Sequence, residues 1–163
     1  RCEVVKESWT FLRSNKRARK IMITNALVGA VSTLVLFFLQ AKLPLAGLGS
    51  ALLGPALFMM GLGAAAGAKI SQYFSGSSYV RMLLASGVGV LFAFGMTFTG
   101  RPYLMILGGF VGALSDDFLE VRTDVLLNEM IPSGQRATLI SVSSFLFSVV
   151  MIVMSTLIGW IMG

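Results

Sequence analysis

Four acidic side chains that could carry chemistry lie close together in an otherwise apolar stretch: Asp116, Asp117, Glu120 and Asp124. An α-helix turns about 100° per residue, so these four carboxylates share one face, whereas Arg122 lies on the other side. Carboxylates inside a hydrocarbon layer are costly unless they face a protein interior or a water-filled cavity, where they commonly mark the path of a proton or a solute. The pattern therefore predicts a substrate or proton-coupling site on this helix.

The depth of these acids separates two interpretations. Asp116 lies after an apolar run of about 20 Å, which would place it just past the middle of a bilayer. The alternative is that the helix leaves the membrane near Ser115 and the acids form an ordinary solvated helix end. A span ending there would be too short to cross the hydrocarbon, so we favour the cavity for Asp116 and Asp117. For Glu120 and Asp124 both interpretations stay open.

Two adjacent carboxylates in such a place repel each other, so we expect at least one of Asp116 and Asp117 to hold a proton near neutral pH. Asn25 and Gln40, on the helix predicted first in the chain, are candidates for contacting the same solute, although Gln40 could instead mark the outer interface. Glu129 and Arg136 flank a turn and are predicted to form a cytoplasmic gate. They would do so as an ion pair, or with Arg136 reaching a lipid phosphate.

Small and polar residues recur at helical spacing near the C-terminus: Ser141, Ser144, Ser148, Met151, Ser155 and Gly159. They could line a cavity, but we favour helix packing, because small residues let helices approach closely in lipid. For the same reason the pairs Gly63 with Gly67 and Gly61 with Ala65 predict a close helix contact.

Soluble-enzyme chemistry is disfavoured. The chain has no histidine, and its one cysteine, Cys2, provides neither a disulfide within the chain nor a metal cluster. No nucleotide or phosphate-binding motif occurs, so no cofactor and no metal site is predicted. The net charge of +6 does not indicate nucleic-acid binding, because the basic residues mostly flank apolar segments.

The elements that must position the acids are membrane helices. Hydrophobic residues make up 56% of the 163 residues and charged residues only 12%, well below a soluble domain. Crossing a bilayer takes about 20 apolar residues. The sequence therefore predicts an all-α, polytopic transmembrane bundle with five spanning helices, at residues 21–40, 45–70, 80–99, 103–128 and 136–162.

Residues 1–20 are predicted to form a cytoplasmic linker at the membrane surface. Val5, Trp9 and Leu12 would share one face of a short amphipathic helix, and the basic run at 16–20 comes directly after it. A specific lipid or partner site is the alternative. With the N-terminus cytoplasmic, only Lys42 and Arg101 of the 13 basic residues lie on the outer side, which predicts a multi-pass protein of the inner or plasma membrane in that orientation.

Three segments carry a resemblance to a known family. LNEMIPSGQRATLISVSSF at 127–145, LRSNKRARKIMITNAL at 12–27 and FFLQ at 37–40 resemble the second half of bacterial transporters of the major facilitator superfamily. The family's loop motif is degenerate here, since Gly67 is kept but Ser71 and Gln72 replace its acidic and basic positions.

The resemblance implies that the five helices are the seventh to eleventh of a twelve-helix transporter fold. The first and fourth helices would line a central cavity, the second and fifth would flank it, and the third would lie outside. The expected partners are a small-molecule solute, membrane lipid and the remaining half of the same transporter. The implied function is secondary active transport by alternating access, with proton coupling as its sharper form. A non-transporting membrane scaffold or sensor subunit, which would use the glycine-rich helix to pack against partners, is the alternative.

Overall fold

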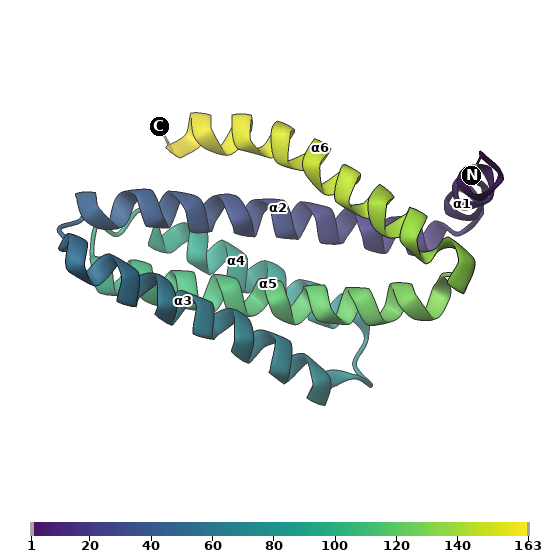
Figure 1. Ribbon diagram of the computed structural model, residues 1–163. Coiled ribbons are helices and arrows are strands. Elements are labelled where there is room, and N and C mark those ends of the chain that lie inside the picture. Colours follow the sequence, from purple (N-terminus) through teal and green to yellow (C-terminus); the bar gives the residue numbers. More distant parts are fainter. Residues whose placement is uncertain (1, 163) are drawn as a thin grey trace.

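In a computed structural model, residues 2–162 of the chain are described, with side chains at position 6 and at 9–161, and every element among them is a helix. The order is α1 (Cys2–Ser14), α2 (Lys16–Leu45), α3 (Ser50–Ser71), the short 3₁₀ helix η1 (Gln72–Phe74), α4 (Tyr79–Met96), α5 (Pro102–Met130), the 3₁₀ helix η2 (Ser133–Gln135) and α6 (Arg136–Met162). The predicted all-α class is confirmed (Figure 1).

Within this described part, four helical segments are long and apolar enough to cross a membrane: Lys16–Leu45, Ser50–Phe74, Tyr79–Met96 and Ser133–Ile161. Helix α5 is not among the four, although its 29 residues exceed the usual length of a span. It is also the helix that carries the clustered acids.

Helix α2 is longer at both ends than the predicted range of 21–40. It begins inside the basic run because Asn15 caps it, with Asn15 Oδ1 accepting a hydrogen bond from the Ala18 amide at 3.0 Å. At the other end Pro44 lies in the last turn, and Gly47 then adopts a positive φ of 93° that starts the turn into α3. The predicted linker is therefore α1 plus the first turn of α2. In α1, Trp9 is exposed and Leu12 buried, and Val5 lies outside the described side chains.

Helix α5 lies at the centre of the bundle, with α3, α4 and α2 packed around it (Figure 1). The contact with α3 has no side chain between the two backbones. Gly63 lies against the carbonyl oxygen of Phe110, and Gly67 lies against that of Leu114. The predicted close contact of this glycine pair is confirmed. The second pair faces outward, since Gly61 has open space where a Cβ would point and Ala65 is exposed.

The contact between α5 and α4 is also made by small residues. A Cβ on Gly112 would lie 2.8 Å from the Ala93 Cβ, and one on Gly108 would meet Met96 at 2.6 Å. Glycines of α3 in one contact and of α5 in the other thus let α3 and α4 approach the α5 backbone closely.

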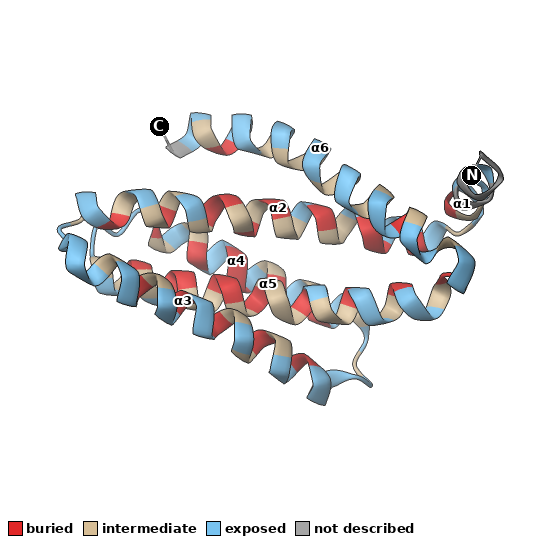
Figure 2. Ribbon diagram, viewed as in Figure 1, coloured by how far each residue is buried: buried red, intermediate tan, exposed pale blue. Residues whose placement is uncertain are grey.

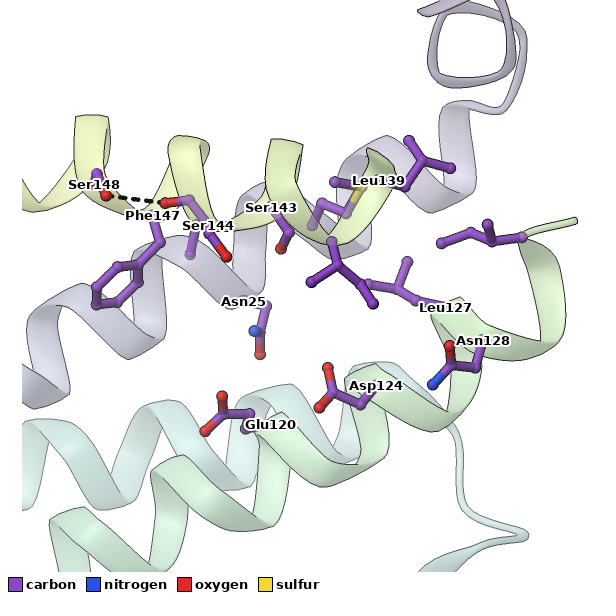
Figure 3. A pocket seen from close by; sticks show the side chains of 14 residues that line it. Asn25, Glu120, Asp124, Leu127, Asn128, Leu139, Ser143, Ser144, Phe147 and Ser148 are labelled. Carbon is purple, nitrogen blue, oxygen red and sulfur yellow. Dashed lines mark hydrogen bonds between the residues drawn. The ribbon is translucent and has the colours of Figure 1, made fainter. Parts of the chain in front are cut away.

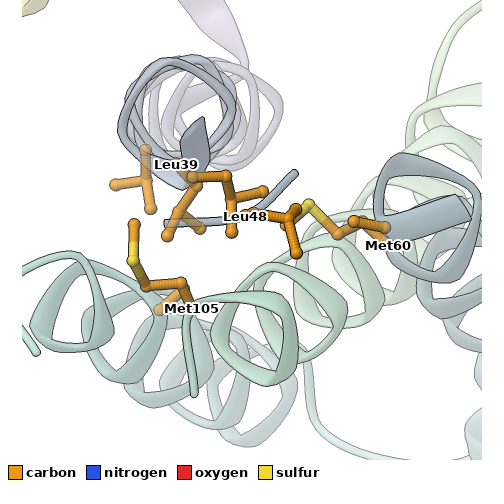
Figure 4. Close-up of a cluster of buried hydrophobic side chains, with 8 residues drawn as sticks. Leu39, Leu48, Met60 and Met105 are labelled. Atoms are coloured by element: carbon orange, nitrogen blue, oxygen red, sulfur yellow. The ribbon is translucent and has the colours of Figure 1, made fainter. Parts of the chain in front are cut away.

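Two apolar clusters close the ends of the bundle. At the turn between α2 and α3, Leu39, Leu48, Met60 and Met105 pack together, each from a different segment (Figure 4). At the opposite end a second cluster joins α1, α2, α5 and α6, and includes Leu12, Ile21, Leu127 and Leu139. Each cluster therefore fixes one end of the helix axes relative to one another.

Helix α6 is the least covered helix in the part of the chain with described side chains. Only Leu139 and Ile158 are buried along it, and Figure 2 shows it almost entirely as exposed or intermediate. It packs mainly on α2. The exposed residues of α6 include Phe145, Ile152 and Trp160, so a broad apolar face is open to lipid or to another protein segment.

The glycine contact generates a stability prediction. A methyl group in Gly67→Ala would collide with the backbone of α5, which cannot rotate away as a side chain can. We expect a loss of about 1–3 kcal/mol in the free energy of unfolding, measured by titrating micelles with sodium dodecyl sulfate. Gly61→Ala is the matched control on the same helix. Because its methyl group meets open space, it should be neutral or stabilise by up to about 1 kcal/mol. Equal losses in the two variants would contradict the contact.

Candidate functional site

A cavity of about 500 Å³ lies between α2, α5 and α6 (Figure 3). The apolar side chains that line it include Leu127, Leu139 and Phe147. The polar side chains that line it come from all three helices: Asn25, Glu120, Asp124, Asn128, Ser143, Ser144 and Ser148. The volume is large enough for a small solute or several water molecules.

The spacing of the α5 residues explains how they reach one cavity. Glu120, Asp124 and Asn128 succeed one another at intervals of four, which is close to one helical turn, so they form a row along α5. Figure 3 shows this row across the cavity from Asn25 on α2. The structure therefore brings Asn25 and Glu120 of the predicted site together with Asp124. Glu120 and Asp124, for which the sequence left the solvated alternative open, are both exposed side chains that line this cavity.

Asp116 lies one turn before Glu120 and does not itself line the cavity. Its carboxylate lies close to Gly29 on α2. A Cβ on Gly29 would be 3.8 Å from Asp116 Oδ1 and 3.5 Å from Phe147 Cε2. Because the Phe147 ring also lines the cavity, Asp116 lies behind that ring, half-buried between α2 and α5.

The other predicted site residues lie further away. Asp117 is half-buried beside Asp116 but outside the cavity lining. Gln40 is fifteen residues from Asn25 along α2, or about 22 Å, so it lies near the far end of the bundle. This placement is compatible with the outer-interface alternative for Gln40.

Glu129 and Arg136 are both exposed, and they lie near Asn128, which lines the cavity. The guanidinium of Arg136 donates a hydrogen bond from Nη2 to the backbone carbonyl of Asn128 at 3.0 Å. Arg136 thereby ties the start of α6 to the end of α5, through the residue next to Glu129.

Of the α6 serines that line the cavity, Ser148 uses its proton within the helix. Ser148 Oγ donates to the Ser144 carbonyl at 3.0 Å, the bond dashed in Figure 3. Ser144 and Ser148 are exposed and line the cavity instead of forming the helix contact that we favoured from the sequence. Their oxygens remain available as hydrogen-bond acceptors.

Asn128 and Ser143 were not singled out from the sequence. Asn128 could have been found by continuing the four-residue spacing of Glu120 and Asp124, whereas Ser143 lies outside the serine stripe.

The chemistry of the cavity is that of an acceptor-rich chamber. Among the described residues that line it, two are carboxylates and none is Lys or Arg. The described side chains contain no group of three or more His, Cys, Asp or Glu arranged to hold a metal ion. The arrangement suits a proton, a cationic solute or a neutral solute that donates hydrogen bonds.

A labelling experiment tests whether the cavity holds water. In a Cys2→Ser background, we expect Ser144→Cys to react with a cationic methanethiosulfonate reagent at least several-fold faster than Leu91→Cys. The thiolate forms only where water reaches it, and the nearby acids attract the reagent. Leu91 is a suitable control because it lies on the exposed apolar face of α4. Equally slow labelling at both positions would rule out a water-filled cavity.

The chain was also compared with known proteins. No protein-family model, no curated protein and no solved structure matches it. The resemblance to the major facilitator superfamily therefore stays a prediction from the three sequence segments.

Proposed function

We propose that this chain is part of a secondary transporter, and that the cavity between α2, α5 and α6 belongs to the path of a small solute. One observation carries the proposal: Glu120 and Asp124 line a common open cavity of about 500 Å³ between α2, α5 and α6, in a bundle whose other long helices are apolar enough to cross a membrane. Carboxylates in such surroundings commonly mark solute or proton paths.

The proposal includes α5 as a fifth span. At about 1.5 Å per residue its 29 residues extend about 43 Å, more than the hydrocarbon thickness. Helices α2, α3 and α4 surround it, so its polar side chains need not meet lipid. Glu120, Asp124 and Asp116 lower its hydropathy without preventing it from crossing, because the first two line the cavity and Asp116 lies against α2.

The packing suits alternating access, in which one group of helices moves against another around a site. Helices α3, α4 and α5 interlock through backbone and glycine contacts. Helix α6 packs on α2 and makes few contacts with α5 in the described chain. The cavity thus lies along a weak helix contact, where opening and closing would disturb little packing.

The proposed solute is small and either cationic or a hydrogen-bond donor, because the cavity offers acceptors. Asp116 and Asp117 are the proposed proton-coupling pair, beside the solute path and not in it. Glu129 and Arg136 belong to the proposed cytoplasmic gate, with the N-terminus of this segment on that side of a cell membrane. The exposed face of α6 is where the remaining half of the transporter would pack.

A second candidate is a non-transporting scaffold or sensor subunit. The observation that favours it is the outward-facing pair Gly61 and Ala65 on α3, which leaves a small-residue surface free for another helix. In that case the cavity would hold water but no transported solute.

Proton coupling is tested with the double variant Asp116→Asn and Asp117→Asn. The protein is reconstituted in vesicles that contain a pH-sensitive dye, and small cationic and neutral solutes are screened with and without a pH gradient. We expect wild-type protein to couple solute entry to a change in internal pH. The double variant should still exchange labelled solute but lose the pH change, because the amides carry no titrating proton.

Two further variants separate the roles. Glu120→Gln should weaken solute exchange itself, since it alters the cavity wall, and Lys69→Gln on the exposed end of α3 should change neither signal. A full pH change in the double variant would refute proton coupling. If the wild-type protein, reconstituted together with the proposed remaining half, moves no solute under either condition, the scaffold candidate is favoured instead.

A further inference from the structure

A second cavity, with a basic and apolar lining, lies on another side of α5, between the first turns of α2 and α4 and the C-terminal half of α5. Its volume is about 370 Å³. Three cationic side chains line it, Arg17 and Lys20 from α2 and Arg122 from α5, and no carboxylate is among its described lining residues. The acidic and basic cavities are thus separated by α5, on which Arg122 points away from the acids.

Arg122 has hydrogen-bonding capacity to spare. Its Nη2 donates to the backbone carbonyl of Ser75, in the turn that precedes α4. Its Nε is buried and has no hydrogen-bond partner among the described residues. Because Nε is not accessible to solvent, the donors that Arg122 can offer to an anionic oxygen in the cavity are those of its terminal guanidinium nitrogens.

The start of α4 adds further donors. Ser78 is the residue that caps α4, and its hydroxyl makes no capping hydrogen bond. The first amides of a helix have no partner within it, and this end of the helix dipole is positive. Ser77, Ser78 and Tyr79 all line the cavity, so these groups and the three cations surround one space.

The remaining lining of the basic cavity is apolar, and includes Ile21, Leu83 and Leu126. The cavity lies at one end of helices that are long enough to cross a membrane, beside the starts of α2 and α4. The cavity therefore offers cations and the first amides of a helix together with apolar side chains, the two kinds of surface that the phosphate and the acyl chains of a phospholipid contact at a membrane interface.

We propose that this cavity binds the phosphate of an anionic phospholipid, with Arg17, Lys20 and Arg122 as its charged ligands. The proposal does not depend on transport. A free phosphate ion would use the same cations, but it would gain nothing from the apolar wall.

The most direct test adds one negative charge without disturbing the fold. Asp and Asn cap helices about equally well, so Ser78→Asp and Ser78→Asn form a matched pair that differs in charge inside the cavity. The probe is phosphatidylglycerol, with phosphatidylcholine for comparison, and its retention on the protein in neutral detergent is measured by native mass spectrometry. We expect wild-type protein and Ser78→Asn to retain phosphatidylglycerol preferentially, and Ser78→Asp to lose that preference several-fold.

A second pair tests the cations themselves. The combined replacement of Arg17, Lys20 and Arg122 by Gln should abolish the preference, whereas replacing Lys6, Lys16 and Lys69 by Gln removes the same charge from exposed positions and should leave it. Circular dichroism checks that the helices form in every variant. Equal retention by Ser78→Asp and Ser78→Asn, or equal losses in the two triple variants, would overturn the site. Displacement of phosphatidylglycerol by an equal concentration of inorganic phosphate would overturn the lipid and indicate a free anion.

Discussion

The backbone of α3 lies directly against the backbone of α5, and the rest of the structure depends on this contact. It exists because Gly63 and Gly67 have no Cβ where the α5 carbonyls pass. In a membrane, lipid tails are as apolar as leucine, so helices associate through close packing more than through burial of apolar surface. Small residues on the α4 side of α5, such as Gly112, extend the same close approach. A helix with two of its sides enclosed in this way can place polar groups only on the sides that remain.

The remaining sides of α5 carry charges of opposite sign. Glu120 and Asp124 face the larger cavity with α2 and α6, and Arg122 faces the smaller one with the starts of α2 and α4. Charges of opposite sign attract strongly in a medium of low dielectric constant, and direct pairing would neutralise both sites. Because the acids and Arg122 lie on different faces of the helix, each cavity keeps its own charge. One helix thus separates a proposed cation or proton path from a proposed anion site.

Helix α6 is packed much less closely against the bundle than α3 is against α5. Along its described length only Leu139 and Ile158 are buried, and both lie on the side toward the other helices. Stability in a protein is unevenly distributed, and elements that move are drawn from the less packed parts. Ser148 of α6, which donates a hydrogen bond to its own helix, can face water or a solute without leaving its donor unpaired. A solute path between two parts of a protein requires that one part is closely packed, as α3 and α5 are, and that the facing part, here α6, has few buried contacts.

Local periodicity in the sequence was enough to predict several features of this protein. The all-α class, the approximate helix positions and the close contact that Gly63 and Gly67 make with α5 all depend on hydrogen bonds and side-chain spacing within a few residues. The first turn of α2 was missed because the basic run was assigned to the linker, although the Asn15 cap was present in the sequence.

Which helix faces meet could be learned only from the packed bundle. Packing brought Asn25 but not Gln40 to the acids, placed Asp116 behind Phe147 and gathered three distant cations around the start of α4. It also directed one glycine pair of α3 inward and the other outward. The physical reason is that nearly every residue of a membrane helix is apolar, so hydropathy does not distinguish the face toward lipid from the face toward protein. That choice is made by the packing of all the helices together.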